Sequence, residues 1–422
     1  MTNETGCGDA RRARRLAASW AAAALLAGCT SGFRGGVLER LADGSIGPPI
    51  PDAAIRFVKE DGSATAQTVS DAGGRYQLSL AIGRYVVTAT HPAYEDYSSA
   101  PGFFVVTGSG FQTGNVFLRA PTVTTVLVVR HADRDDGLDA LLVPQGTDRA
   151  VRLAEVGAKA GVTAIYSTNT VRTRATAQPL ADALGLSIQL YGSPAEVAGS
   201  IAADHPGDVV LVVGHSDTTT ALAEAIVGQD LYPGSANPLT DDFDQLFIVA
   251  RVVGAAPGSV VDLQYGADTG PDTPNLSRAQ TTNVLLLRHA ETAGSGLSPA
   301  GQARAAELVH AARNAGVSAL FAPPASVAAA TVAPLAAAIG RSVTAYDPAD
   351  LPALVNEIFS AHAGQTVLVA GDNPTLRGLV RELGAQPVPP IFDAEFDHLM
   401  IVLAPAPRTG RLLSLQYGAV SP

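Results

Sequence analysis

The pattern of apolar and polar positions changes near residue 120. Between residues 34 and 120, short apolar runs alternate with polar residues, as where Tyr76, Leu78 and Leu80 alternate with Gln77 and Ser79. Gly, Asp and Pro interrupt these runs about every 10 residues, which predicts an all-β sandwich. From residue 121 onward, short apolar strands alternate with Ala-rich helical stretches. This second pattern predicts an α/β fold with a mostly parallel sheet.

The α/β part of the chain contains one pattern twice. Residues 126–132 recur as residues 284–290, and three more blocks recur in the same order at nearly the same spacing: 161–166 as 316–321, 209–214 as 366–371, and 263–267 as 415–419. Such a repeat predicts two structural copies. We assign them to residues 121–267 and 283–420, joined by a linker at 268–282 that is rich in Gly, Pro, Asp and Thr.

The N-terminus has the layout of a targeting segment. Four arginines within residues 11–15 precede an apolar run at 16–28, which is too short to span a bilayer comfortably. The run ends in Leu26-Ala27-Gly28-Cys29, which resembles the bacterial lipobox. The resemblance implies that a signal peptide of residues 1–28 is removed and that Cys29 carries the lipid. We therefore expect a lipid-anchored protein of the cell envelope, outside the cytoplasm.

Composition removes several classes of function. The 422 residues are 47% hydrophobic, enough to build several packed domains. The net charge is −11 and the only basic run lies in the first 15 residues, so we expect no nucleic-acid partner. Two cysteines are too few for a disulfide framework or a cysteine-rich zinc site.

Candidate chemistry lies where predicted strands end. Arg130 and His131 follow a buried apolar run, His215 follows another, and Arg172 follows a third after a short polar loop. Ligands of open α/β sheets bind beyond the carboxyl ends of the strands, so these side chains could meet in one pocket. Arginines match the oxygens of a phosphoryl group, and a neutral histidine can attack its phosphorus. Such chemistry needs no metal or other cofactor.

Three motifs in this order resemble the histidine phosphatase (phosphoglycerate mutase-like) superfamily: Arg130-His131-Ala132, residues 166–177, and Gly214-His215. The resemblance implies a three-layer α/β fold. It also implies a histidine acid phosphatase-like hydrolase, which cleaves phosphomonoesters or phosphoanhydrides of small molecules through a phosphohistidine. In that scheme His131 is the nucleophile, Arg130 and Arg172 hold the phosphoryl oxygens, and His215 is a further donor to the phosphate.

The region 34–120 has a resemblance of its own. Residues 50–53, 70–76 and 82–85 are similar to the carboxypeptidase regulatory-like (transthyretin-like) sandwich. That resemblance implies a spacer or binding adaptor without chemistry, and it leaves the partner of the sandwich unidentified.

The proton donor for the leaving group stays open among three residues. Asp217 follows His215 closely, Glu196 lies on a later segment, and Asp133 follows the first motif directly. Asp217 could equally cap the helix expected from Thr218. Arg134, with Glu196, is a candidate for contacts with the substrate at the mouth of the pocket.

The second copy departs from this pattern. Arg288, His289 and Glu291 are present, but Val327 stands at the position of the second arginine and Asp372 at that of the second histidine. A carboxylate opposes phosphate binding, so we interpret the second copy as a degenerate phosphatase domain, with Asp372 as a replacement proton donor the less favoured alternative.

A rival function belongs to another class. The chain could be a binding or scaffolding lipoprotein whose phosphatase-like domains are relics. In its favour, the first copy has Val143-Pro144-Gln145-Gly146 where the superfamily has a Leu-Thr-x-x-Gly turn, which the second copy keeps in residues 297–301. We interpret the acidic stretch 241–244 as solvated surface, because it lacks the spacing of a calcium loop. The remaining histidines are interpreted as structural: His91, His205, His310, His362 and His398.

Overall fold

The computed structural model describes residues 31–421, apart from 42–43, 92–93, 109, 138–139, 232–241, 256, 270–276, 278–279 and 386–389. The predicted signal peptide and Cys29 lie outside the described residues, as does most of the predicted linker. Within the described part, no helix is both long and apolar enough to cross a membrane. The chain forms two compact units that divide after Ala120.

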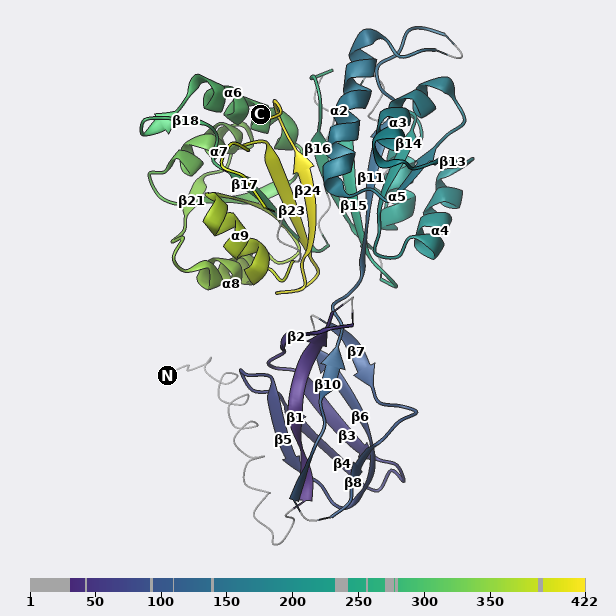
Figure 1. The fold of residues 1–422 in the computed structure, drawn as a ribbon, viewed down its shortest axis with the longest axis vertical. Helices are drawn as coiled ribbons and strands as arrows, with labels where there is room; N and C mark the ends of the chain where they lie inside the picture. Colours follow the sequence, from purple (N-terminus) through teal and green to yellow (C-terminus); the bar gives the residue numbers. More distant parts are fainter. Residues whose placement is uncertain are drawn as a thin grey trace, which may run out of the picture. The chain divides into compact units, whose positions relative to one another are not determined.

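The first unit consists of two five-stranded sheets (Figure 1). In one sheet, β1 (Ser31–Arg40) pairs with β2 (Ile46–Pro49), β5 (Arg75–Ser79), β9 (Gly110–Thr113) and β10 (Val116–Leu118). In the other, β6 (Gly83–His91) pairs with β3 (Ala54–Lys59), β7 (Tyr94–Ser98) and β8 (Phe104–Val106), and β4 (Thr65–Val69) pairs with β3. Side chains of both sheets, among them Phe33 of β1 and Phe57 of β3, share one core. The predicted β-rich region is confirmed, whereas its transthyretin-like form stays a prediction.

The second unit begins with the first lobe, a six-stranded sheet in the order β13-β12-β14-β11-β15-β16. Its four parallel strands are β11 (Val123–Arg130), β12 (Ala164–Ser167), β13 (Ile188–Leu190) and β14 (Val209–Gly214). The antiparallel strands β15 (Gln245–Val252) and β16 (Ser259–Gln264) complete it, so the sheet is mixed. Its helices are α2 (Pro144–Ala160), α3 (Val171–Leu184), α4 (Pro194–Asp204) and α5 (Thr219–Val227).

The second lobe has the same strand order, β21-β20-β22-β17-β23-β24. Its sheet strands are β17 (Thr282–Arg288), β20 (Val317–Ala322), β21 (Val343–Ala345), β22 (Thr366–Gly371), β23 (His398–Ala404) and β24 (Arg411–Gln416). Its helices are α6 (Pro299–Ala312), α7 (Val327–Ala338), α8 (Leu351–Ala361) and α9 (Asn373–Glu382). A small ribbon of β18 (Thr292–Ala293) and β19 (Gly296–Leu297) precedes α6. The sequence repeat thus corresponds to a repeat of topology.

Helices cover both faces of each sheet. All eight residues of β11 are buried: Leu127 and Val129 pack on the face covered by α2 and α3, and Val126 and Val128 pack on the face covered by α4 and α5. A strand buried on both faces has no polar side, which explains its continuous apolar run.

The two lobes share a hydrophobic core. Helix α2 packs against β24 of the second lobe, and α6 packs against β16 of the first (Figure 1). Leu153, on α2, and Leu413, on β24, belong to the same buried cluster. The exchange is reciprocal, so each lobe supplies a helix that covers the edge strand of the other.

Candidate active site

Three neighbouring chain segments bring the predicted residues together. Arg130 is the last residue of β11 and pairs with Gly214, the last residue of β14, so His131 and His215 leave adjacent strands at the same edge. Arg172 lies in the first turn of α3, which follows the adjacent strand β12. The ring centroids of the two histidines are 5.6 Å apart.

His131 is fixed in one tautomer. Its side chain is buried, and its Nδ1 lies 2.9 Å from the carbonyl oxygen of Ala132. Because a carbonyl only accepts, Nδ1 carries the proton and Nε2 keeps its lone pair. Burial, together with the charges of Arg130 and Arg172, lowers the pKa of His131 to about 3. The ring is therefore neutral near pH 7, as a nitrogen nucleophile must be.

His215 is held between two side chains. Nη2 of Arg172 lies 3.2 Å from Nδ1 of His215, and Oγ1 of Thr168 lies 2.8 Å from Nε2. A guanidinium only donates, so Nδ1 accepts and Nε2–H donates to Thr168. Burial, followed by the charge of Arg172, lowers the pKa of His215 and favours this neutral ring.

Arg130 is buried at the end of β11. Its Nη1 donates to the backbone carbonyl of Asp242 at 3.0 Å, and its guanidinium lies 4.0 Å from the centre of the Phe243 ring. These two contacts hold the guanidinium beside the end of β11. The Phe243 ring also lies 5.8 Å from that of His131.

The described part of the acidic stretch, residues 242–244, is not the solvated surface that the sequence suggested. Asp242 and Asp244 are buried, and burial together with the neighbouring Asp244 raises the pKa of Asp242. A backbone hydrogen bond holds Asp244 in this buried position: the N–H of Tyr265, just after β16, donates to the carbonyl of Asp244, just before β15.

Three contributors had no role in the sequence interpretation. Thr176 accepts from the N–H of Ala132 at 2.9 Å and donates to the carbonyl of Arg172, so it links the two motifs. Thr168 and Phe243 have the contacts described above. The place of Thr168 just beyond the end of β12 could have indicated a site residue. No feature of the sequence around Phe243 indicates that it belongs to the site.

The three candidate proton donors have different surroundings. Asp133 is engaged in an ion pair, with Oδ2 2.6 Å from Nε of the buried Arg149. Glu196 is exposed and accepts from Gly192 N–H, while Ser193 accepts from Glu196 N–H, as in a capping box. Asp217 is exposed. Its charge acts to raise the pKa of His215, but burial and the charge of Arg172 have larger effects and lower that pKa.

Asp217 does not cap a helix. Helix α5 begins at Thr219 with Thr218 as its N-cap residue, and no side chain caps it. Arg134 is half-buried, and its Nη1 donates to the carbonyl of Asp135 at 2.7 Å. Its charge is among those that lower the pKa of His215. Among the described residues, Asp217 is thus the candidate donor whose side chain serves no structural contact.

The second lobe preserves the frame around its histidine. His289 Nδ1 bonds the carbonyl of Ala290, Thr331 accepts from the N–H of Ala290, and Arg288 stacks on Phe396. Thr331 donates to the carbonyl of Val327, just as Thr176 donates to that of Arg172. Val327 therefore occupies the position of the second arginine.

Two acidic residues of the second lobe have structural contacts. Burial raises the pKa of Asp372, but hydrogen bonds from Thr375 outweigh this effect and lower it, as Asp372 caps α9. Glu291 pairs with Arg304 at 2.6 Å, which is the counterpart of the Asp133–Arg149 pair.

The unusual turn of the first lobe keeps its geometry. Val143 supplies no side-chain cap for α2, whereas Ser298 caps α6. Nevertheless a Cβ on Gly146 would clash with the carbonyl of Asp133, as one on Gly301 would with that of Glu291. The close approach that demands glycine is therefore the same in both lobes.

Known families match two segments of the chain. Residues 126–199 match the histidine phosphatase superfamily (branch 1), and residues 40–128 match the carboxypeptidase regulatory-like domain. These matches confirm the two resemblances that the motifs indicated. No curated protein matches the chain.

Parts of the chain are similar to solved structures that are named as phosphatases. The putative phosphohistidine phosphatase SixA from Nakamurella multipartitia is 21% identical, with 36% of this chain and 96% of that chain covered and a TM-score of 0.25. The putative phosphohistidine phosphatase SixA from Agrobacterium tumefaciens is 26% identical, with 32% of this chain and 99% of that chain covered and a TM-score of 0.25. The protein histidine phosphatase SixA complexed with tungstate is 20% identical, with 34% of this chain and 96% of that chain covered and a TM-score of 0.27.

Proposed function

We propose that the first lobe is a phosphatase that hydrolyses phosphomonoesters or phosphoanhydrides through a phosphohistidine. The observation that carries the proposal is the tautomer of His131: its Nδ1 is bonded to Ala132, so its Nε2 lone pair is available beside Arg172 and His215. A buried neutral imidazole among arginines suits attack on a phosphorus atom that carries anionic oxygens.

The reaction has two steps. Nε2 of His131 forms a bond to phosphorus while the bond from phosphorus to the leaving oxygen breaks, and an acid protonates that oxygen. Water then attacks the phosphohistidine: its oxygen bonds to phosphorus while the bond to Nε2 breaks, and one of its protons passes to the carboxylate that the acid has become. This step releases inorganic phosphate and restores both the acid and the neutral ring. Arg130 and Arg172 hold the phosphoryl oxygens, and an oxygen replaces the His215 ring as acceptor for Arg172. Asp217 is the proposed acid.

The second lobe is proposed to be catalytically inactive. Val327 provides no charge, and Asp372 places a carboxylate at the position that His215 has in the first lobe. Two like charges 4 Å apart repel by about 4 kcal/mol at an effective dielectric constant of 20. Its preserved frame and shared core make it a structural partner of the first lobe.

A test uses the full chain with p-nitrophenyl phosphate from pH 4 to 8, with and without a chelator. We expect chelator-resistant turnover that falls at least about 1,000-fold in His131→Gln. His289→Gln, the matching change in the second lobe, should leave it unchanged. Phosphate binding without turnover would instead favour the rival binding or scaffolding function, which the degenerate second lobe keeps open.

The lipid anchor on Cys29 is a separate proposal that rests on the Leu26-Ala27-Gly28-Cys29 tetrad. Mass spectrometry of the membrane fraction should find a diacylglyceryl-modified N-terminal peptide that begins at Cys29. Cys29→Ser should abolish this modification. An unmodified Cys29 in the mature protein would contradict the anchor.

A further inference from the structure

The interface between the lobes has an asymmetric cluster of metal-binding side chains. Asp244 precedes β15, Asp268 follows β16, and His310 lies in the last turn of α6 from the second lobe. One ligand atom from each lies within 4.8 Å of the other two. We propose that these three residues bind a divalent cation of the Zn²⁺ type, which no part of the phosphatase chemistry requires.

The distances fit a shared cation better than direct hydrogen bonds. Nε2 of His310 lies 3.7 Å from Oδ2 of Asp244, and Nδ1 lies 3.9 Å from Oδ2 of Asp268. Both separations exceed a hydrogen bond. Ligand atoms that are each about 2.1 Å from one ion lie roughly 3.0–4.2 Å apart, so the 3.7 Å pair has the right spacing.

Buried atoms without partners point to a missing ligand. Asp244 is 1% exposed, and its Oδ1 has no hydrogen-bond partner. Both ring nitrogens of His310 are also buried without one. A buried carboxylate oxygen and imidazole without partners are costly, and a cation between them would remove that cost.

The counterpart position on the other side of the interface lacks this cluster. Arg149 of α2 and Arg304 of α6 make equivalent ion pairs, so Glu155, further along α2, corresponds to His310 of α6. Glu155 bonds Arg152 at 2.6 Å. Asp397, the counterpart of Asp244, accepts from Gln416 and Ser421. Only the cluster around His310 combines ligand chemistry with unsatisfied atoms among these described pairs.

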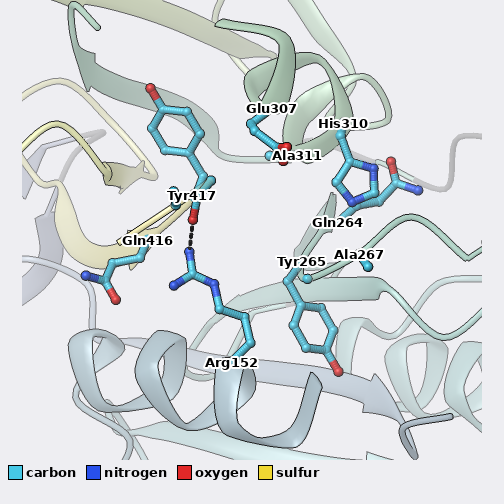
Figure 2. Close-up of a pocket in the computed structure, with 12 residues that line it drawn as sticks. Arg152, Gln264, Tyr265, Ala267, Glu307, His310, Ala311, Gln416 and Tyr417 are labelled. Atoms are coloured by element: carbon cyan, nitrogen blue, oxygen red, sulfur yellow. Dashed lines mark hydrogen bonds between the residues drawn. The ribbon is translucent and has the colours of Figure 1, made fainter. Parts of the chain in front are cut away.

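The site borders a pocket between the lobes. The pocket has a volume of about 270 Å³, and His310 lines it together with Arg152 and the backbone beside Tyr265 and Tyr417 (Figure 2). In Figure 2, His310 and Arg152 come from opposite helices, and the two tyrosine rings lie on opposite sides. Three protein ligands leave a tetrahedral ion one position, which water or an anionic oxygen from the pocket would fill.

The types of ligand in the cluster favour a divalent cation of the first transition row. One imidazole and two carboxylates suit Zn²⁺, Co²⁺ or Mn²⁺ better than Ca²⁺, which prefers six to eight oxygens. Arg313 lies with Nη2 3.5 Å from Oδ2 of Asp268 and would orient this carboxylate from outside. The ion would join the lobes, and it would also hold Asp244 beside Phe243, which packs on His131.

The test uses the full chain, stripped with a chelator, dialysed and titrated with Co²⁺, then with Zn²⁺. We expect the visible absorption of protein-bound Co²⁺ at one equivalent, displaced by Zn²⁺, and a rise in Tm with Zn²⁺. His310→Gln and Asp268→Asn should weaken binding about 100-fold, since loss of even an outer partner of a ligand costs 10- to 100-fold.

Control variants distinguish binding at this cluster from binding elsewhere on the chain. Glu155→Gln, the counterpart change, should bind Co²⁺ like the wild type, and each variant's Tm without metal shows whether it folds. Asp268→Asn changes an exposed residue, so it keeps the test valid if His310→Gln fails to fold. Equal Co²⁺ spectra in wild type and both variants, or no spectrum in the wild type, would overturn the proposal. Neither readout depends on phosphatase turnover.

Discussion

Nη2 of Arg172 lies 3.2 Å from Nδ1 of His215, and this contact decides the tautomer of the His215 ring. Because the guanidinium is always a donor, the ring must be neutral with its proton on Nε2. The contact also holds the guanidinium over the edge of the sheet, next to His131. The contact thereby joins two motifs that lie 43 positions apart in the chain.

Arg172→Lys should lower kcat/KM for p-nitrophenyl phosphate by about 100-fold. An ammonium cannot reproduce the planar fork that binds two phosphoryl oxygens, and loss of one transition-state donor costs about 10²–10³ in rate. Steady-state kinetics measures the effect. Arg174→Lys is the matched control, because Arg174 is exposed on the same helix. Equal losses in both variants would argue against a specific role for Arg172.

The loss in kcat caused by Asp217→Asn should depend on the leaving group of the substrate. For phenyl phosphate, whose leaving oxygen needs a proton, we expect kcat to fall about 100-fold or more. For p-nitrophenyl phosphate the loss should be much smaller, because nitrophenolate leaves without protonation. Glu196→Gln should change neither rate, since its carboxylate is part of a helix cap. A uniform loss with both substrates would remove Asp217 as the acid.

His131 should make stability depend on pH. Its pKa of about 3 in the folded chain lies below the ordinary value of 6.5, chiefly through burial. As the pH falls below 6.5 the unfolded chain binds the proton first, so the free energy of unfolding decreases. From pH 7 to pH 5 the loss is about 2 kcal/mol from this residue. The lowered pKa of His215 acts in the same direction.

Denaturant unfolding at the two pH values measures this effect. His131→Gln should lose less stability than the wild type on acidification, while His289→Gln should behave like the wild type. An identical loss in wild type and His131→Gln would mean that the buried ring does not resist protonation.

Asp133→Asn should destabilise the fold and leave the chemistry of the folded protein intact. The change leaves Arg149, whose side chain is 1% exposed, without its carboxylate. Breaking a buried ion pair in this way costs about 3–5 kcal/mol. Thermal unfolding measures the loss, and Glu291→Gln should act in the same direction in the second lobe. A fall in kcat at unchanged stability would restore Asp133 as a candidate acid.

Sequence patterns anticipated the parts that local spacing encodes. The continuous apolar run ending at Arg130 predicted a strand buried on both faces, and the recurrence at residues 284–290 predicted a second copy. The absence of an arginine at Val327 was visible from the spacing to Thr331 alone. The antiparallel pairing of β15 with β11 and β16 was not anticipated, because apolar runs look alike whichever direction their neighbours take.

The amino-acid sequence alone determined the α/β class, the β-rich first unit and the residues that reach the strand ends, because periodicity and strand termination are local properties. Only the tertiary structure decided that Asp133 serves Arg149, that Phe243 packs on Arg130, and that Asp244 meets His310 across the interface between the lobes. These relationships join positions far apart in the chain. Their energetics depend on burial and on the partner that packing supplies, which no local pattern records.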